Sequence, residues 1–358
     1  MPLLQPKPTI GDLLPRLARS PDAYPQKLDL PSWTVLVVLF DADTYRRASF
    51  LDDRILGAAT QGAWLPVDHA AEAARQVAQP CPLHFIFHTG HVGSTLVSRL
   101  LDETGKVLSL REPLPLRTLA EASDCLGRSD SLLSAGQFNL ALALFMRLWS
   151  RGYESTHSVV VKATSSAGRL AVPILGASEG ARAIYMNLRA EPYLATLLAG
   201  ANSLTDLRGH GPERMRRLQA RSPVPLEPLH SLSSGELAAL SWLAESASQH
   251  AALTRFPGRV MALDFDAFLA SIADGMALML DHLELSPDTR YLAQIERSAV
   301  LTRYSKAPEH AYTPELRADV LRESRRDNRE EIRKGMRWLE RQAQADPAFA
   351  AIVNAAAL

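Results

Sequence analysis

The chain has 358 residues, of which 47% are hydrophobic and 22% are charged, and its 39 acidic residues balance its 39 basic ones. This composition excludes an intrinsically disordered protein, and the zero formal net charge leaves no overall field to attract nucleic acid or an acidic membrane. The two cysteines, Cys81 and Cys125, exclude a disulfide framework, and neither has metal-ligand spacing around it. We therefore expect no metal and no nucleic-acid partner.

No segment of the sequence has the pattern of a targeting signal or a membrane span. Residues 1–8 lack a charged start followed by an apolar stretch, and apolar runs such as 35–40 are far shorter than the roughly 20 residues that cross a bilayer. The sequence therefore predicts a soluble cytoplasmic protein with no membrane partner. It leaves the oligomeric state open.

Residues 1–80 are predicted to form an added N-terminal lobe. An apolar run at 34–40 indicates a strand, and the apolar spacing over 41–55 suits a short helix. The alanine-rich stretch 68–79 is helical in pattern up to a proline-rich break. The sequence assigns no function to this lobe.

From residue 81 onward, apolar runs alternate with helical patterns, which is typical of a parallel sheet covered by helices on both faces. We therefore predict a P-loop-type α/β domain over 81–358, with three layers, α/β/α, around a central parallel sheet. The apolar runs predict strands at 83–88, 107–110, 158–162, 182–188 and 259–264.

Two longer segments of this domain lack a strand pattern. Residues 201–236 carry glycine, proline and serine without an apolar period, which predicts a mobile loop insertion and a candidate lid over a bound substrate. Residues 313–344 have many opposite charges three and four positions apart. Because acids are interleaved with the arginines, this pattern predicts a solvated charged helix and not a nucleic-acid patch.

An apolar run, a glycine turn and a helical pattern follow one another without a gap in residues 84–101. A helix that begins straight after such a turn directs its unpaired N–H groups and its positive dipole end at an anion in the turn. Gly90 and Gly93 let the backbone approach a phosphate, and Ser94 and Thr95 add hydroxyl donors. The order therefore predicts a phosphate-binding strand, loop and helix.

This loop departs from the nucleotide-hydrolase pattern GxxxxGK[ST]. His88 stands at the position of the first glycine, and Ser94 stands at that of the lysine. A nucleotide-dependent phosphotransferase also needs an acidic strand end for Mg²⁺, for which Asp264 and Asp266 are the candidates. Because the loop lysine is missing, phosphotransfer ranks as an alternative function.

Polar side chains follow the C-terminal ends of several predicted strands, the edge at which parallel α/β sheets bind ligands. Besides the loop, these are Glu112, Lys162 and Arg189. Lys162 ends an apolar run, where its charge is costly to bury unless it meets an anion, and the fork of donors on Arg189 suits a phosphate. Pro113 favours an extended backbone that fixes the aim of Glu112, and Arg111 is placed to pair with it.

The loop segment 91–96, His-Val-Gly-Ser-Thr-Leu, resembles the 5′-phosphosulfate loop of the sulfotransferases that use 3′-phosphoadenosine 5′-phosphosulfate (PAPS). His91 stands where that family has lysine or arginine. The glycine-rich C-terminal nucleotide loop of the eukaryotic cytosolic enzymes is absent, so the resemblance is to the broader, mostly bacterial group, over residues 81–340. Four more segments resemble family segments in family order: 108–116, 159–164, 183–192 and 259–268.

The resemblance implies transfer of a sulfuryl group from PAPS to a hydroxyl or amine of a small-molecule or glycan acceptor, with 3′,5′-adenosine diphosphate (PAP) as product and no metal. The implied catalytic residues are Glu112 as general base, Lys162 as a cation at the leaving oxygen, and His91. Both His91 and His88 are rival bases. The implied donor-binding residues are Gly90, His91, Val92, Gly93, Ser94, Thr95, Arg189, Thr196 and Lys306, with Arg189 at the 3′-phosphate.

Several alternatives stay open from the sequence. Lys162 is equally consistent with a strand-end lysine that extends its amine to solvent, and Arg189 with an ion pair to Glu191. His91 in place of a cation, and Pro192 one residue later than in the family turn, favour a weakened sulfotransferase-like protein. Such a protein would bind a nucleotide or a partner without chemistry.

Overall fold

The computed structural model describes residues 9–200, 202–286, 289–307 and 309–355. Parts of the predicted segments lie outside the described residues: 1–8 of the N-terminal lobe, 201 of the loop insertion, and 287–288, 308 and 356–358 of the larger domain. No helix in the described part of the chain combines the length and the apolar character needed to cross a bilayer.

Five parallel strands form the central sheet in the order β5-β6-β4-β7-β8. All five predicted strands are confirmed, with ends that move by at most one residue. Leu83 pairs with Val159 on one side of β4, and Phe85 pairs with Ala183 on the other. The strands are β4 (Leu83–His88), β5 (Val107–Arg111), β6 (Ser158–Lys162), β7 (Ala183–Asn187) and β8 (Val260–Asp264).

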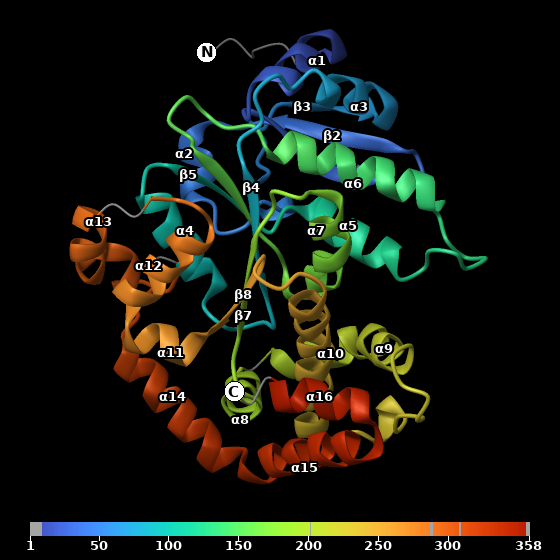
Figure 1. The fold of residues 1–358 in the computed structure, drawn as a ribbon, viewed down its shortest axis with the longest axis vertical. Helices are drawn as coiled ribbons and strands as arrows, with labels where there is room; N and C mark the ends of the chain where they lie inside the picture. The colour runs from blue at the N-terminus through green and yellow to red at the C-terminus, as the bar shows by residue number, and fades with distance from the viewer. Residues whose placement is uncertain (1–8, 201, 287–288, 308, 356–358) are drawn as a thin grey trace.

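Alternate residues of these strands belong to two separate hydrophobic cores. Phe85, Phe87 and Tyr185 lie in one core, and Ile86 and Ile184 lie in the other, because successive side chains of a strand point to opposite faces. Figure 1 shows helices on both sides of the sheet, which confirms the predicted three-layer α/β fold. The first core includes α5 (Leu114–Ser123), α6 (Ala135–Trp149) and α7 (Ala171–Ala177), and the second includes α4 (Ser94–Glu103), α8 (Ala190–Ala199), α11 (Phe265–Ala270) and α12 (Ile272–His282).

The N-terminal lobe contains a second sheet, antiparallel, with the order β1-β2-β3. The predicted strand is β2. Its two neighbours were not predicted, because β1 carries Pro25 at a register shift and β3 has five residues that begin with glycine and end with proline. The lobe's elements are α1 (Ile10–Arg19), β1 (Ala23–Asp29), β2 (Thr34–Leu39), α2 (Ala42–Arg47), β3 (Gly62–Pro66) and α3 (Val67–Arg75).

The lobe packs against the larger domain. Its α3 contacts α6, and its β1 contacts α5, so that both sheets share one hydrophobic core. The predicted helix over 41–55 is shorter than expected: α2 ends at Arg47, and only a single 3₁₀ turn, Asp53–Ile55, follows. A division of the chain at residue 80 stays a prediction.

The predicted mobile loop at 201–236 is wrong for most of its described residues. Residues Ser203–Gln219 form α9, a 3₁₀ turn follows at Leu229–Ser231, and α10 (Ser234–Arg255) begins before the segment ends. Helix α9 could not be recognised from an apolar pattern. Its buried positions are Leu207, Gly211, Arg214 and Leu218. Their spacing is helical, but two of the four are not apolar, and Gly209 and Pro212 add loop-like signals.

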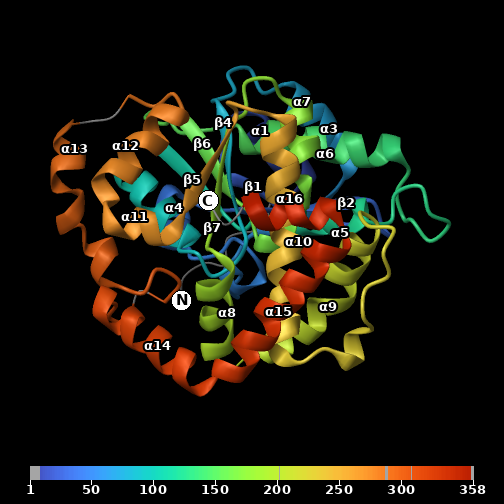
Figure 2. The ribbon, with the colours of Figure 1, turned by 60° about the horizontal axis from the view of Figure 1, so that its bottom comes forward.

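The predicted solvated helix at 313–344 is two helices, of which one is largely packed. Figure 2 shows α14 (Pro314–Asp327) and α15 (Arg329–Ala345) along the edge of the molecule, followed by α16 (Pro347–Ala355). Ile332 and Trp338 of α15 are buried against α10. A Cβ at Gly335 would lie 2.5 Å from the Gly235 carbonyl oxygen, so glycine allows this close approach. The charges therefore cover only the outer face of α15. The remaining helix of the domain is α13 (Thr289–Gln294).

Glu331 joins α15 to the first turn of α10. Its carboxylate accepts hydrogen bonds from the Ser234 hydroxyl and the Gly235 N–H, both at 2.9 Å, and from Lys334 Nζ at 2.7 Å. Burial alone would raise the pKa of Glu331, but these hydrogen bonds outweigh it and lower the pKa to about 2. A depressed carboxyl pKa gives stability that is present above the unfolded value of 4.5 and is lost as the pH falls toward about 2.

We expect Glu331→Gln to lower the free energy of unfolding at neutral pH by about 1 kcal/mol, because solvent screens much of this interaction. The variant should also lose less stability than the parent protein between pH 4.5 and about 2. Urea unfolding across that range measures both effects. Glu330→Gln is the matched control, since the exposed Glu330 pairs only with Arg333 on its own helix. Equal losses in the two variants would contradict the role of Glu331.

Candidate functional site

The phosphate loop connects the end of β4 to the start of α4. Three of its residues, Gly90, His91 and Gly93, have positive φ angles of 103°, 54° and 67°. Gly93 occupies the N-cap position of α4, and no side chain there accepts a hydrogen bond from the first turn. The N–H groups at the start of α4 are therefore available to an anion in front of the loop.

A cavity of about 560 Å³ lies in front of this loop. It brings together predicted donor-binding residues that are far apart in the sequence, since Thr196 of α8 and Lys306 line it beside the loop. His310, which lies near Lys306 in the sequence, also lines it. The loop residues that line the cavity are His91, Val92, Gly93, Ser94 and Thr95.

The cavity also has lining residues that the sequence did not indicate. Arg303 and Arg317 add positive charge, and Phe265, Tyr304 and Tyr312 add aromatic rings. No motif marks these residues: Arg317 is one of many arginines in a charged helix, and the resemblance implies no donor-binding residue in the segment that directly follows β8. Their position became visible only when the fold brought that segment and α14 to the loop.

Asp264 and Asp266, the candidates for a metal site, have other partners. Asp264 caps α11 by accepting a hydrogen bond from the Ala267 N–H at 2.9 Å. Asp266 forms an ion pair with Arg317, whose Nη2 lies 2.7 Å from Oδ1. Within the described residues, no three histidine, cysteine, aspartate or glutamate side chains gather in a group that could hold a metal ion.

His88 holds the loop in place and is not available as a base. Its Nδ1 accepts a hydrogen bond from the Gly90 N–H at 3.1 Å, so its Nε2, 2.9 Å from the Ala163 carbonyl oxygen, is assigned as the donor. Burial, and then the charges of Lys162 and Lys306, lower the pKa of His88 well below its ordinary value. A neutral ring with both nitrogens engaged has no free site for a proton.

His91 lies in the loop itself, with its side chain exposed toward the cavity. Desolvation by its surroundings and the charge of Lys306 lower its pKa to about 4. The imidazole is therefore neutral at pH 7 and does not replace the permanent cation that a lysine or arginine would supply. Lys306 is the cation that acts on His91 most strongly.

Glu112 and Lys162 form a buried ion pair at the ends of β5 and β6, with Nζ bound to Oε1. Lys162 is fully buried, which excludes a strand-end lysine that reaches solvent. Burial lowers the pKa of Lys162, and the charge of Glu112 opposes that effect. Glu112 has a φ of 56°, a strained conformation for this residue, and its N–H donates to the Lys162 carbonyl oxygen at 2.6 Å.

The predicted pair between Arg111 and Glu112 does not form. Arg111 is buried and forms an ion pair with Asp102 of α4. Its Nη1 donates to the carbonyl oxygens of Tyr45 and Ala48, each at 2.9 Å. The prediction was wrong because neighbouring residues of a strand point to opposite sides, and Glu112 follows the last residue of β5.

Four residues of the predicted site do not line the cavity: Gly90, Arg189, and the ion pair of Glu112 and Lys162. Arg189 is exposed at the N-cap of α8, and within the described part of the chain its side chain makes no hydrogen bond or ion pair. Glu191, its alternative partner, instead accepts from Arg325 Nε at 2.8 Å. Lys306 lines the cavity beside the loop, and its charge adds to the effect of burial in lowering the pKa of Lys162.

These residues fit a phosphorylated nucleotide. The Thr89 and Thr95 hydroxyl oxygens are buried at the loop without a hydrogen-bond partner among the described residues, which is costly unless a ligand or water supplies one. The uncapped start of α4 and the cations Lys306 and Arg303 supply the complementary donors and charge.

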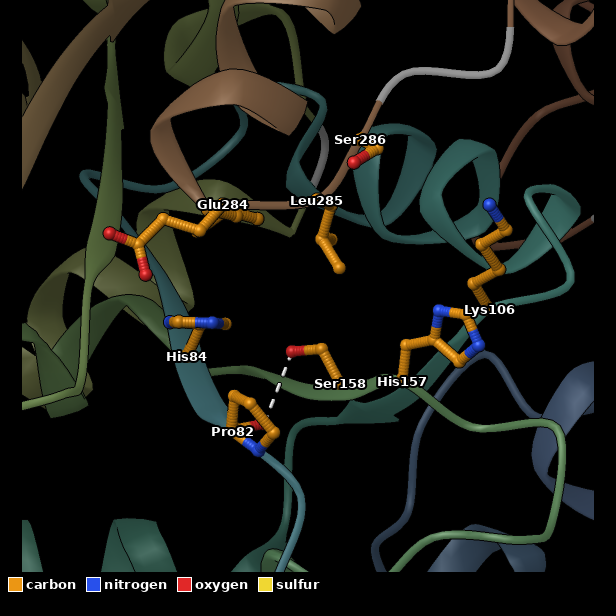
Figure 3. A pocket seen from close by; sticks show the side chains of 9 residues that line it. Pro82, His84, Lys106, His157, Ser158, Glu284, Leu285 and Ser286 are labelled. Atoms are coloured by element: carbon orange, nitrogen blue, oxygen red, sulfur yellow. Dashed lines mark hydrogen bonds between the residues drawn. The ribbon is translucent and has the colours of Figure 1, made fainter.

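A second cavity, of about 290 Å³, lies at the opposite edge of the sheet, near the N-terminal ends of the strands. Figure 3 shows His84, Lys106 and His157 around it. The Nδ1 atom of His84 accepts a hydrogen bond from the Arg182 N–H at 3.2 Å, which orients the ring. Burial lowers the pKa of His84 to about 4. None of the predicted site residues lines this cavity.

No family model and no curated protein sequence matches the chain. Among solved structures, the sulfotransferase domain from the curacin biosynthetic pathway is similar at 14% identity with a TM-score of 0.39, covering 70% of this chain and 97% of that domain. Sulfotransferase STF9 from Mycobacterium avium is similar at 11% identity with a TM-score of 0.39, covering 89% of this chain and 96% of that protein.

Proposed function

We propose that the chain is a sulfotransferase that moves a sulfuryl group from PAPS to a hydroxyl or amine of a small-molecule or glycan acceptor. The observation that carries this proposal is the phosphate loop, with its uncapped helix start and unpartnered Thr95 hydroxyl beside a buried Glu112–Lys162 pair. A phosphate loop of this kind is compatible with several reactions. We choose sulfuryl transfer because the sequence motifs follow one another in the order found in the sulfotransferase family.

The donor would lie in the cavity in front of the loop. The N–H groups of Ser94 and Thr95 and the Lys306 amine are placed to neutralise the charge that grows on the leaving phosphate oxygen. Thr196 lines the same cavity, and Arg189 follows β7, the neighbour of β4. We assign Thr196 to the 3′-phosphate from its place in the cavity, and Arg189, which does not line the cavity, from the family resemblance alone.

The acceptor side of the site would be Glu112. Its carboxylate takes the proton of the acceptor hydroxyl, the acceptor oxygen forms a bond to sulfur, and the bond from sulfur to the phosphate oxygen breaks, so that PAP leaves with the electron pair. Lys162 binds the carboxylate and supplies a cation at the end of β6. With His88 engaged on both nitrogens, Glu112 is the stronger candidate for the base.

Of the two alternative functions, only one has an observation that favours it. A catalytically weakened sulfotransferase-like protein that binds a nucleotide or a partner is favoured by the neutral His91, which leaves the loop without its own cation. A phosphotransferase is disfavoured, because Ser94 stands in place of the loop lysine and Asp264 and Asp266 are engaged elsewhere.

Calorimetric titration of the full chain with PAP, beside ATP with Mg²⁺ at the same ionic strength, tests the proposal. We expect PAP to bind about a hundredfold more tightly than ATP, because the site offers cations for two separate phosphates and no metal ligands. Tighter binding of ATP would move the chain to the phosphotransferases. Binding of neither nucleotide would reject the proposed donor site.

A further inference from the structure

A separate pocket of about 400 Å³ opens on the N-terminal lobe, between α2 and the 3₁₀ turn Asp53–Ile55. Its polar lining consists of Thr44, Arg47, Ser49 and Arg54, and Phe50 contributes a ring. Two cations therefore line the pocket, and no carboxylate does. Such a lining suits an anionic ligand.

Backbone hydrogen bonds fix this pocket beside the candidate base. The Leu51 N–H donates to the Arg111 carbonyl oxygen at 2.7 Å, and the Arg111 guanidinium binds the Tyr45 and Ala48 carbonyl oxygens. Arg111 directly precedes Glu112. The hydrogen bond and charge of Asp52 raise the pKa of Arg54 against the effect of burial, and the charge of Glu112 adds to the rise. The pocket therefore lies beside the strand end that carries Glu112.

A second set of bonds ties the pocket to the donor cavity. Arg99 of α4 donates from Nη2 to the Ser49 hydroxyl at 2.8 Å and from Nε to the Ser305 carbonyl oxygen at 2.9 Å. Ser305 precedes Lys306, and both line the donor cavity. Arg99 therefore links the pocket wall at Ser49 to the donor-cavity wall at Ser305.

The two lining arginines differ in how they are held. Arg54 is fixed: its Nε lies 2.8 Å from Asp52 Oδ1, and its guanidinium carbon lies 3.5 Å from the centre of the Phe50 ring. Arg47 is exposed, and its guanidinium makes no hydrogen bond or ion pair within the residues that the structure describes. One arginine is thus preorganised, and the other is free to bind a ligand oxygen.

We infer that this pocket is the acceptor subsite and that it binds an anionic group, a carboxylate or a sulfate ester, carried by the same molecule whose hydroxyl or amine faces Glu112. The inference rests on the proposed function. It gives the N-terminal lobe a role in the reaction, which is to select acidic acceptors, and it narrows the acceptor class to acidic small molecules or acidic glycans.

Calorimetry on the PAP-saturated full chain tests the inference with matched probes. One pair compares glucuronate with glucose, and the other compares 4-hydroxyphenylacetate with its neutral amide. A further probe, 4-hydroxybenzenesulfonate, distinguishes a sulfate-like group from a carboxylate. We expect the anionic member of at least one pair to bind about tenfold more tightly than the neutral one, the effect of one charge-assisted hydrogen bond. The double variant Arg47→Gln/Arg54→Gln should remove this preference.

Arg46→Gln is the control, because Arg46 lies on the same helix, pairs with Asp43 and does not line the pocket. PAP affinity should stay the same in all variants. If PAP binds but the members of each pair bind equally or not at all, the inference is wrong and the proposed function stands. If PAP does not bind, the proposed function fails, and a preference for anions would then mark a pocket that is not an acceptor subsite.

Discussion

Gly93→Ala is expected to abolish binding of PAP, with a loss of affinity of about a hundredfold or more, which is equivalent to about 2.7 kcal/mol. A Cβ at this position would lie 2.1 Å from Cε2 of Phe265, far inside van der Waals contact. Phe265 begins α11 and lines the donor cavity, so its ring cannot move away without closing that cavity or opening the loop. Calorimetric titration with PAP measures the effect directly.

Gly105→Ala provides the control for backbone strain. Gly105 has nearly the same φ, 70° against 67° at Gly93, but a Cβ there would meet no atom within 4 Å. Both substitutions therefore carry the left-handed strain of about 1–2 kcal/mol, and only Gly93→Ala adds the collision at the loop. PAP binding that falls equally in the two variants would show that strain, not the shape of the loop, accounts for the loss.

The sheet was predictable because its strands carry an unbroken signal. Each strand is a short apolar run, and every residue of β4 is buried, so hydrophobicity alone marks its position. The same logic placed the loop, Glu112 and Lys162 at one edge, since parallel strands share their C-terminal side. These inferences need only the direction of the chain and the rule for ligand binding in such sheets.

Contacts between residues that lie on different helices and strands could not be predicted in this way. The buried face of α9 contains Arg214, which lies near Glu245 of α10, a contact that no local pattern reveals. The partner of Arg111 is Asp102, which depends on how α4 packs on β5. In the same way, Arg303 and Arg317 joined the donor cavity only through the fold of the C-terminal third of the chain.

Glu112 and Lys162 are the most informative residues to replace, because single and double substitutions should change the free energy of unfolding and kcat in different ways. Replacing one partner leaves the other charge buried and unpaired, which costs about 3–5 kcal/mol, whereas replacing both is often neutral. The Glu112→Gln variant should therefore have a lower free energy of unfolding than the parent protein. The pKa of Lys162, already lowered by burial, should fall further, because the carboxylate charge that raises it is gone.

We expect Glu112→Gln to lower kcat by about 10²–10⁴-fold while leaving PAP affinity unchanged, since the glutamine amide cannot accept the acceptor proton. The double variant Glu112→Gln/Lys162→Met separates the roles: it should recover the free energy of unfolding of the parent protein but not its kcat. Urea unfolding and steady-state transfer from PAPS to an acidic acceptor give the two readouts. Recovery of kcat together with stability would show that the pair only holds β5 and β6 together, and the base would then have to be sought on another residue.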